Sequence, residues 1–485
     1  MHFVVKFFPE ITIKSPPVRK RFVKQLRRNL HRLLKSLVAG IEVKAGWDKF
    51  DIVAPSDSKQ DTAKVAGVLA NTPGIAYFAE VTVFDFEQIE DIGPQVLLIW
   101  QESLMGKSFA VRVKRSGEHA FKSIDVERMV GAVLNRGCES AQVKLKNPDI
   151  TIRLEIVKQR CFIVLKQQQG LGGYPLGTQE PVLSLVSGGF DSTVASYLTN
   201  KRGLTTHFCF FNLGGRAHEL GVKEVSYYLW QKFAASHNVR FISVPFEGVV
   251  SEILENVHNS QMGVVLKRMM LRVATKVARD LKIGALVTGE SVAQVSSQTL
   301  TNLRVINSVT ELLVLRPLIT MDKGEIINLS RAIGTEEYAA NMPEYCGVIS
   351  VKPTTRATIE RIEAEEANFN WQILDAAYEA RRDMAISEVA NDLGGELESL
   401  SVTKKLEESD VVVDIRHPNE AEIEPLTVSA ATLKIPFYKL NTQFQTLDQD
   451  KFYLLYCDKG VMSQLHAAHL RDEGFENVGV YQAED

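Results

Sequence analysis

The sequence predicts a multidomain protein that combines α+β and α/β units, at least one of them a doubly wound parallel sheet. Three observations support this prediction. With 485 residues the chain is too long for one hydrophobic core, so about three domains are expected. Strand and helix signals alternate with the spacing of a parallel α/β sheet over residues 180–340. The hydrophobic content of 45% and the charged content of 24% are those of an ordinary globular protein.

The first unit, residues 1–75, shows the strand and helix order of a small ferredoxin-like α+β unit. Strands are expected at Phe3–Phe8, Ile41–Val43, Phe50–Val53 and Ile75–Phe78, and helices at Val18–Leu34 and Ala63–Leu69. The stretch from Lys14 to Lys35 holds nine Lys/Arg and no acidic residue, whereas the C-terminal part is acidic. This asymmetry suggests a polyanionic partner at one end of the chain. The candidate contacts on this helix are Lys20, Lys24, Arg27 and Arg28.

The second unit, residues 63–167, overlaps the first at its start. Helices are expected at Gln95–Leu104 and Val126–Leu134, and strands at Phe109–Arg115, Gln142–Lys146 and Ile150–Ile156. Lys144 and Lys146 would alternate along one strand and so share a face. A solvated strand face is the commoner reason for such alternation, but the basic helix upstream favours nucleic-acid binding. The Gln- and Gly-rich stretch Gln167–Thr178 is interpreted as a domain boundary.

The most informative motif is the Ser/Gly loop Ser187–Ser192. It follows a buried strand, Val182–Val186, and precedes the helical run Thr193–Leu198. Glycines allow close approach of the backbone, and a helix N-terminus offers free N–H groups to phosphate. No Gly-Lys-Ser/Thr follows, so the loop is not a Walker motif. It matches the loop of enzymes that cleave ATP between the α- and β-phosphates, the alternative being an ordinary strand-to-helix turn.

Further nucleotide-site candidates follow other strands of the same sheet. Strands are expected at Thr206–Phe211, Arg240–Val244, Ala285–Thr288 and Leu312–Leu315, with helices at Val222–Phe233 and Val264–Leu281 and a charged helical region over 357–395. Ligands of such sheets bind at the carboxyl ends of the strands. Gly289 would let the backbone approach a ribose or base, and the basic helix Lys267–Arg272 would meet phosphates. Asp191 suits Mg²⁺ or phosphate positioning, and Lys323 suits a leaving pyrophosphate.

Cys457 is the strongest candidate for sulfur chemistry. It lies in a C-x-x-G-x-x-S loop between a strand, Phe452–Tyr456, and a helical run, Gln464–Leu470. Backbone N–H groups and a helix N-terminus stabilise a thiolate or a persulfide there. The alternative is a buried structural cysteine. Cys346, between Pro343 and Gly347, is expected in a loop beyond the nucleotide sheet.

The five cysteines are scattered and form no CxxC pair, which argues against a zinc site and against a secreted disulfide framework. Cys138, Cys161 and Cys209 are interpreted as packing residues. No apolar run of about 18 residues is present, so no membrane span is expected. The start of the chain does not resemble a secretory signal, and we expect a cytoplasmic protein.

The whole chain resembles the tRNA 4-thiouridine synthetases (tRNA sulfurtransferases), in their long form. The resemblance implies a ferredoxin-like domain, a THUMP RNA-binding domain (63–167), an ATP-pyrophosphatase-type domain (178–395) and a rhodanese-like domain (405–483). The motif matches imply nucleotide contacts at Leu185, Val186, Ser187, Gly188, Gly189, Asp191, Ser192, Lys267, Gly289 and Gln298, with Lys323 assisting. Phe109–Ser123 looks like the THUMP strand-loop, with RNA contacts at Lys114, Arg115 and Lys122. Asp414–Arg416 resembles the rhodanese Asp-x-Arg.

The resemblance also implies a reaction. ATP and Mg²⁺ would adenylate O4 of a uridine, position 8 in the family, and a Cys457 persulfide would replace that oxygen with sulfur. Cys346 would act as the resolving cysteine, so that the reaction ends in a Cys346–Cys457 disulfide that a reductant reopens. Rhodaneses that use thiosulfate often carry Arg near Met462, so a cysteine desulfurase is the expected donor. A second role, through a sulfur-carrier protein of thiamine thiazole synthesis, is implied.

Two rival functions remain at this stage. An amidotransferase-coupled synthetase with the same loop would need neither Cys457 nor tRNA. A tRNA-binding sulfur carrier with an idle nucleotide site would need Cys457 but not Asp191. The sequence leaves open whether the chain forms a homodimer.

Overall fold

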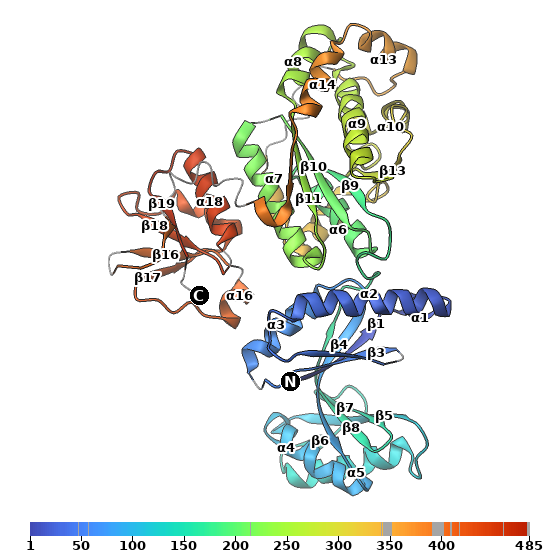
Figure 1. Ribbon diagram of the computed structural model, residues 1–485. Coiled ribbons are helices and arrows are strands. Elements are labelled where there is room, and N and C mark those ends of the chain that lie inside the picture. Colours follow the sequence, from blue (N-terminus) through green and yellow to red (C-terminus); the bar gives the residue numbers. More distant parts are fainter. Residues whose placement is uncertain are drawn as a thin grey trace. The chain divides into compact units, whose positions relative to one another are not determined.

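The computed structural model describes residues 1–46, 48–56, 58–213, 215–340, 342, 352–389, 402–407, 410–416, 418–458 and 460–482. The chain divides into two compact units, Met1–Gly173 and Tyr174–Asp485 (Figure 1). Among the described residues, no helix has the length and apolar character needed to cross a membrane.

The first unit is built on one eight-stranded sheet with the order β2-β3-β1-β4-β8-β7-β5-β6. Its elements are β1 (His2–Phe7), α1 (Pro9–Thr12), α2 (Pro16–Leu34), β2 (Glu42–Ala45), β3 (Lys49–Val53), α3 (Lys59–Ala70), β4 (Ile75–Asp85), η1 (Ile89–Asp91), α4 (Ile92–Leu104), β5 (Ser108–Ser116), α5 (Ser123–Gly137), β6 (Gln142–Val143), β7 (Ile150–Val157) and β8 (Arg160–Gln169). Strand β4 is longer than expected because it pairs with β1 on one side and with β8 on the other. The two predicted α+β units therefore share one sheet.

Two expectations for this unit are wrong. Gln167–Gln169, expected in a linker, belong to β8 and pair with Tyr77–Ala79. Lys144 and Lys146 do not alternate along a strand, because β6 ends at Val143. The chain turns away there: Asn147 has a φ of 48° and Pro148 lacks an N–H. Both lysines are exposed on the resulting loop.

The larger sheet of the second unit has the order β13-β12-β9-β10-β11-β14. Its elements are β9 (Val182–Val186), α6 (Phe190–Lys201), β10 (Thr206–Asn212), α7 (Gly215–Leu229), η2 (Trp230–Ala234), β11 (Arg240–Pro245), α8 (Glu247–Asn256), α9 (Met262–Asp280), β12 (Ala285–Val287), η3 (Ser296–Gln298), α10 (Leu300–Asn307), β13 (Leu313–Leu315), α11 (Lys323–Ile333), α12 (Glu336–Ala340), α13 (Ile359–Glu366), α14 (Trp371–Glu379), β14 (Arg382–Ala385) and η4 (Ile386–Glu388). Strands β9 to β13 are parallel, as predicted. Strand β14 is antiparallel to β11 and lies in the region expected to be helical.

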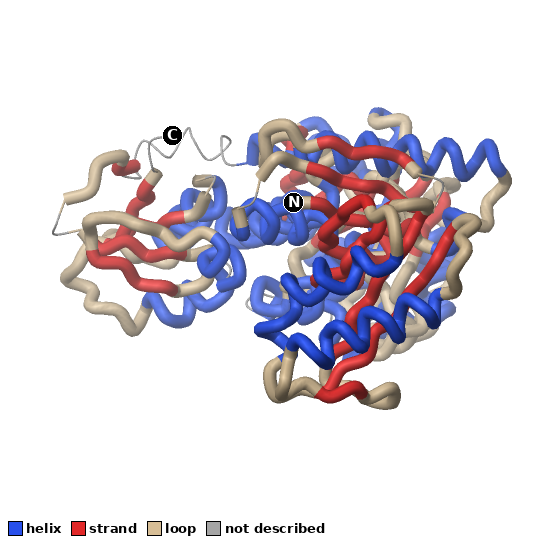
Figure 2. The backbone as a smooth tube through the Cα atoms, turned by 90° about the horizontal axis from the view of Figure 1, so that it is seen from below, coloured by secondary structure: helices blue, strands red, loops and turns tan. Residues whose placement is uncertain are grey.

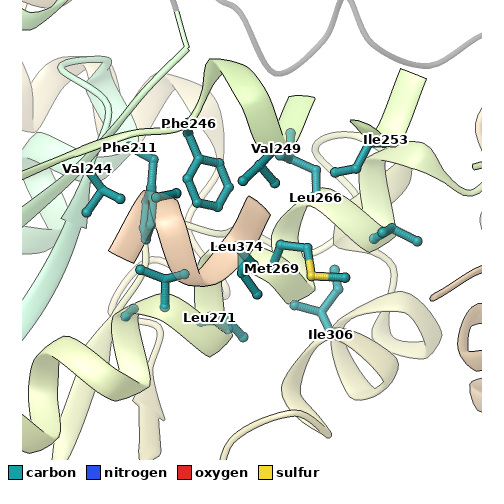
Figure 3. Packing of buried hydrophobic residues seen from close by; sticks show 14 of the residues in the cluster. Phe211, Val244, Phe246, Val249, Ile253, Leu266, Met269, Leu271, Ile306 and Leu374 are labelled. Carbon is teal, nitrogen blue, oxygen red and sulfur yellow. The ribbon is translucent and has the colours of Figure 1, made fainter. Parts of the chain in front are cut away.

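Alternate residues of the central strands face opposite layers of helices. Leu183 of β9 and Phe211 of β10 belong to a buried cluster with α8, α9 and α14 (Figure 3). Ser184 points the other way and bonds Ser196 of α6 across 2.8 Å. Because helices cover both faces of the sheet, a ligand is expected to bind at the carboxyl ends of its strands.

The C-terminal sheet is parallel, with the order β15-β19-β18-β16-β17. Its elements are β15 (Val402–Thr403), β16 (Val411–Asp414), α16 (Pro418–Ile423), β17 (Ala431–Lys434), α17 (Phe437–Phe444), β18 (Tyr453–Tyr456), α18 (Val461–Asp472) and β19 (Val478–Tyr481). Figure 2 shows its strands in red with helices in blue beside them. Because β16 and β18 are neighbours, the residues that follow them, Ile415–Arg416 and Cys457, meet at one edge.

Candidate functional site

The Ser187–Ser192 loop connects the end of β9 to the first turn of α6. Gly188 has a φ of 80°, and a Cβ atom there would lie 2.4 Å from Met342 Cε. Ser192 Oγ accepts a hydrogen bond from the Ser187 N–H at 3.1 Å. Helix α6 has Gly189 as its N-cap and no side-chain cap. The first N–H groups of α6 are therefore suited to an anion.

Two candidates from distant parts of the sequence meet beside this loop. Lys323 Nζ, at the start of α11, lies 2.9 Å from Asp191 Oδ1. Gln294 Nε2 donates to the other oxygen, Asp191 Oδ2, at 2.7 Å. Lys323 also lies 5.3 Å from the centre of the Phe190 ring. The pair is partly exposed, so both side chains are within reach of a ligand.

A second charged cluster is centred on Glu290, just after β12. Its carboxylate accepts from Lys267 Nζ at 3.0 Å, from Arg316 Nε at 2.8 Å and from the Thr288 hydroxyl at 3.0 Å. Burial by itself would raise the pKa of Glu290, but Lys267 and Arg316 hold the pKa below its usual range. Glu290 is therefore an ionised carboxylate that fixes two cations.

Unmade hydrogen bonds in this region fit a ligand. Gln298 Oε1 and Arg316 Nη2 are buried and have no hydrogen-bond partner among the described residues. Buried polar atoms are rarely left unpaired, because each costs about 1–3 kcal/mol. A nucleotide offers both donors and acceptors, so these two atoms fit a nucleotide site.

The structure gives a different reason for glycine at position 289. A Cβ on Gly289 would lie 2.5 Å from the carbonyl carbon of Asp191 and 2.6 Å from the nitrogen of Ser192. The end of β12 thus packs directly on the backbone of the Ser187–Ser192 loop. Glycine is required here by protein packing, whether or not a ribose approaches.

Part of the expected basic helix has a structural role instead. Arg268 is fully buried and makes a bidentate ion pair with Glu366, and Arg272 contacts the same carboxylate at 2.9 Å. Neither points its charge at phosphates, because the guanidinium groups of both donate to Glu366 of α13. Among Lys267, Arg268 and Arg272, Lys267 is the residue that reaches the strand-end cluster.

Cys457 lies in the predicted cradle between β18 and α18. The Ser463 N–H donates to Cys457 Sγ at 3.3 Å, and the Ser463 hydroxyl lies 3.5 Å from the same sulfur. Gly460, the N-cap of α18, has a φ of 70°, which favours glycine. Ser463 is buried, so its N–H is a donor held in place by the fold.

A buried arginine lies next to this loop. The Arg416 guanidinium makes two hydrogen bonds to Asp414, at 2.9 and 2.7 Å, and one to Asp458 at 2.8 Å. Burial opposes the charge, but Asp414 and Asp458 outweigh that effect and raise the pKa of Arg416 above its usual range. Arg416 is therefore positively charged, and its hydrogen bonds to Asp414 and Asp458 join the residues that follow β16 to those that follow β18.

Cys457 borders a small cavity of about 110 Å³. Its other walls include Tyr227 and Tyr228 of α7, Tyr338 of α12 and Phe437 of α17. None of the nucleotide-site residues described above lines it. In this arrangement the sulfur faces an aromatic wall.

The cysteines fall into different environments. Cys138, Cys161 and Cys209 are buried, and burial raises the pKa of Cys161 and of Cys209 to about 12, as suits packing residues. Cys457 is half-buried. Cys346, the predicted resolving cysteine, lies outside the described residues.

Helix α2 presents its basic residues on the face opposite its core side. Phe22, Leu26 and Leu30 are buried, whereas Lys20, Lys24, Arg27 and Arg28 are exposed. Arg27 Nε donates to the carbonyl oxygen of Val43 at 3.0 Å, so its guanidinium is partly engaged. The spacing of the others by four residues places them on one side of the helix.

The remaining RNA candidates do not share one face. Lys114 and Arg115 are adjacent on β5 and therefore point to opposite sides of the sheet. Lys114 is exposed, whereas Arg115 lies 5.7 Å from the Phe121 ring. Lys122 is exposed just before α5. An RNA that contacts Lys114 across the sheet would not contact Arg115 from the same side.

Sequence reasoning missed Gln294, and it placed Glu290 and Arg316 in strand-end segments that fit an ATP site without giving either side chain a role. Glu290 follows Gly289 at a strand end, and Arg316 follows β13, so their positions were a usable signal. Gln294 lies in a loop and carries no such signal.

Comparison with known proteins identifies the family. Family models match residues 2–79 (ThiI ferredoxin-like domain), 85–166 (THUMP domain), 177–371 (thiamine biosynthesis protein, ThiI) and 399–483 (rhodanese-like domain). The tRNA sulfurtransferase of Shewanella sediminis is 52% identical over 99% of this chain and 100% of its own length, and that of Saccharophagus degradans is 53% identical over the same shares.

A solved structure supports the same assignment. The crystal structure of a 4-thiouridine synthetase–RNA complex with bound ATP matches with a TM-score of 0.70 and 26% identity, over 79% of this chain and 99% of that one. The predicted fold class, the resemblance and the prediction of an enzyme are confirmed. The chain belongs to the tRNA sulfurtransferase family.

Proposed function

We propose that this enzyme uses ATP to convert a uridine of tRNA, position 8 in the family, into 4-thiouridine. The observation that carries the proposal is the presence of two strand–loop–helix centres in one compact unit. One is the Ser187–Ser192 loop with the Asp191–Lys323 pair, and the other is the Cys457 cradle. The similarity to the 4-thiouridine synthetase with bound ATP supports this pairing. We infer that tRNA modification takes place in the cytoplasm.

In the first step, the uridine O4 attacks the α-phosphorus of ATP and pyrophosphate leaves. The N–H groups at the start of α6 hold phosphate oxygens, and Lys323 neutralises charge on the leaving group. Mg²⁺ held by Asp191 and the phosphates would add further charge neutralisation. Leu185, Val186, Gly289 and Gln298 form the rest of the proposed nucleotide site. The product is a uridine adenylated at O4, and this oxygen leaves with AMP in the second step.

In the second step, a persulfide on Cys457 supplies the sulfur. On one route its outer sulfur displaces AMP at C4, and Cys346 then attacks the Cys457 sulfur and leaves one sulfur on C4. On the other route, Cys346 attacks the inner sulfur first and releases sulfide, which displaces AMP. Both routes end in a Cys346–Cys457 disulfide that a reductant must reopen.

The second step requires the two centres to approach. Cys457 borders a cavity with walls from α7 and α12, so we expect its loop to leave that cavity before it delivers sulfur.

The proposed partners follow from the chemistry of each segment. A cysteine desulfurase loads Cys457, since Met462 offers no charge to thiosulfate. The exposed basic residues of α2 and Lys114, Lys122, Lys144 and Lys146 contact tRNA phosphates. A sulfur-carrier protein of thiazole synthesis is a second acceptor, in line with the thiamine-related family model. We assign these roles to domains 1–75, 63–167, 178–395 and 405–483, and leave open a homodimer.

Sulfur labelling tests the proposal. Unmodified tRNA is incubated with the protein, ATP, Mg²⁺, a cysteine desulfurase and radiolabelled cysteine, and labelled 4-thiouridine is measured after digestion. Asp191→Ala and Cys457→Ser are each expected to abolish the product, whereas Cys138→Ser serves as the matched cysteine control. Normal thiolation by Asp191→Ala would favour a tRNA-binding sulfur carrier with an idle nucleotide site. Normal thiolation by Cys457→Ser would refute the persulfide assignment.

A further inference from the structure

We propose that Arg316 is a further binding residue of the nucleotide site, where it donates to a phosphate oxygen, and that Glu290 positions it together with Lys267. This inference rests on the proposed binding of ATP and adds a residue that the motif comparison did not assign. It is carried by the place of Arg316 in the sheet, by the charge of its cluster and by an unmade hydrogen bond.

Arg316 lies at the same sheet edge as the phosphate loop. It directly follows β13, which neighbours β12, and β12 neighbours β9. The Thr288 N–H donates to the carbonyl oxygen of Leu315 at 3.0 Å, which ties the ends of β12 and β13 together. One residue beyond Thr288, Gly289 packs on the backbone of Asp191. Backbone contacts thus connect the Ser187–Ser192 loop to the end of β12, and the end of β12 to the residue before Arg316.

The cluster around Glu290 carries one positive charge more than it carries negative charge. Glu290 is the shared acceptor for Lys267 and Arg316, and the side chains of Glu290 and Arg316 are only 9% and 15% exposed. An excess buried cation is unfavourable unless an anion accompanies it. A phosphate group supplies that anion.

The hydrogen bonds of Arg316 are incomplete in a specific way. Its Nε donates to Glu290 and its Nη1 to Asn307 Oδ1 at 3.2 Å, but Nη2 is buried with no partner among the described residues. Arg268 is a useful comparison: its Nε, Nη1 and Nη2 all donate, to Glu366, Val305 and Ser308. All three guanidinium nitrogens of Arg268 thus donate to protein acceptors, as in a structural arginine. In Arg316, Nη2 remains available to donate to a ligand.

The phosphate belongs to the nucleotide rather than to tRNA. Exposed cations, such as Lys24 and Arg28 on α2, are suited to contact the phosphates of a tRNA backbone. Arg316 is mostly buried and is coupled through Glu290 to Lys267, which itself matches a nucleotide-site position. The guanidinium therefore meets a ligand that enters the strand-end site.

The experiment separates binding from folding with a charge-matched pair of variants. Arg316→Gln, Glu290→Gln and the double variant are compared for ATP affinity by equilibrium dialysis with Mg²⁺, for tRNA affinity, and for the unfolding midpoint in urea. Arg304→Gln, which removes an exposed arginine of α10, is the control for loss of one positive charge. We expect Arg316→Gln to weaken ATP binding at least about tenfold, as loss of a charged hydrogen bond does.

The double variant gives the decisive result. In Arg316→Gln the Glu290 carboxylate keeps its ion pair with Lys267, and in the double variant no carboxylate remains for Arg316 to balance, so ATP affinity should stay low in both. Recovery of ATP affinity in the double variant would mean that Arg316 only balances Glu290, and would refute the inference. So would ATP affinity within twofold of Arg304→Gln, or a loss confined to tRNA. Wild-type protein that binds no ATP would refute the proposed function itself, and this inference with it.

Discussion

Replacement of Gly289 by alanine should separate the phosphate loop from the strand that supports it. The added Cβ would lie 2.5 Å from the Asp191 carbonyl carbon, 2.6 Å from the Ser192 nitrogen and 2.8 Å from the Asp191 oxygen. All three are backbone atoms, so no side chain can rotate away. Ordinary contact begins at 3.4 Å, so the two segments must move apart by about 0.9 Å.

This displacement should cost both stability and activity. Overpacking of a well-packed contact typically destabilises a protein by about 1–3 kcal/mol. Because Asp191 lies in the moved segment, its carboxylate and the N–H groups of α6 shift with respect to Lys323. A misplacement of about 1 Å in a catalytic site can reduce the rate about 100-fold. We therefore expect Gly289→Ala to fold with reduced stability and to thiolate tRNA about 100-fold more slowly.

The assay is ATP-dependent thiolation at saturating persulfide, together with urea unfolding. Gly284→Ala is the matched control, because a Cβ at Gly284 meets nothing within 4 Å although the residue directly precedes β12. That variant should behave like the wild type in both measurements. Wild-type ATP affinity and thiolation by Gly289→Ala would refute the packing argument, since they would require a 2.5 Å contact to be harmless.

Three further predictions follow from the described contacts. Arg416→Ala leaves the buried Asp414 carboxylate unpaired and should lower the free energy of unfolding by about 3–5 kcal/mol, as measured in urea. Burial lowers the pKa of His466, so the unfolded state takes up a proton at higher pH than the folded state, and the free energy of unfolding falls from pH 7 toward pH 5. His466→Gln should make the corresponding decline of the urea midpoint shallower. An unchanged slope would contradict the argument. Lys24→Ala combined with Arg28→Ala should weaken tRNA binding and flatten its dependence on salt, as measured by filter binding, whereas a purely structural role predicts the same salt slope.

The sequence was sufficient where function follows from position in a parallel sheet. The run Val182–Val186 and the Ser/Gly loop that follows it identify a strand and a helix start without knowledge of the fold. The meeting of Asp191 with Lys323 was predictable for the same reason, because each follows a strand of one sheet. Cys457 and its C-x-x-G-x-x-S loop were likewise local features.

The sequence was insufficient where pairing depends on distant segments. Strand β14 is short and charged, and it exists because β11 offers it an edge. The Glu290 cluster unites residues from α9 and from the ends of β12 and β13, whose positions predicted a common site but not the pairing of Glu290 with both Lys267 and Arg316. The loop of Lys144 and Lys146 is a different case, because Asn147 and Pro148 were a visible turn signal that the alternation of charges obscured.

The two centres share one strand–loop–helix geometry, which suits the two anions of the proposed mechanism. In each, a buried strand ends, a glycine with positive φ turns the chain, and a helix begins: Gly188 before α6 and Gly460 before α18. In the first loop the Ser187 and Ser192 side chains bond to each other, so the helix N–H groups remain for an external anion. In the second, Cys457 follows the strand at once and its own sulfur takes the Ser463 N–H. On the proposed mechanism the second site carries its anion covalently, and the cavity of about 110 Å³ beside it leaves room for one more sulfur atom.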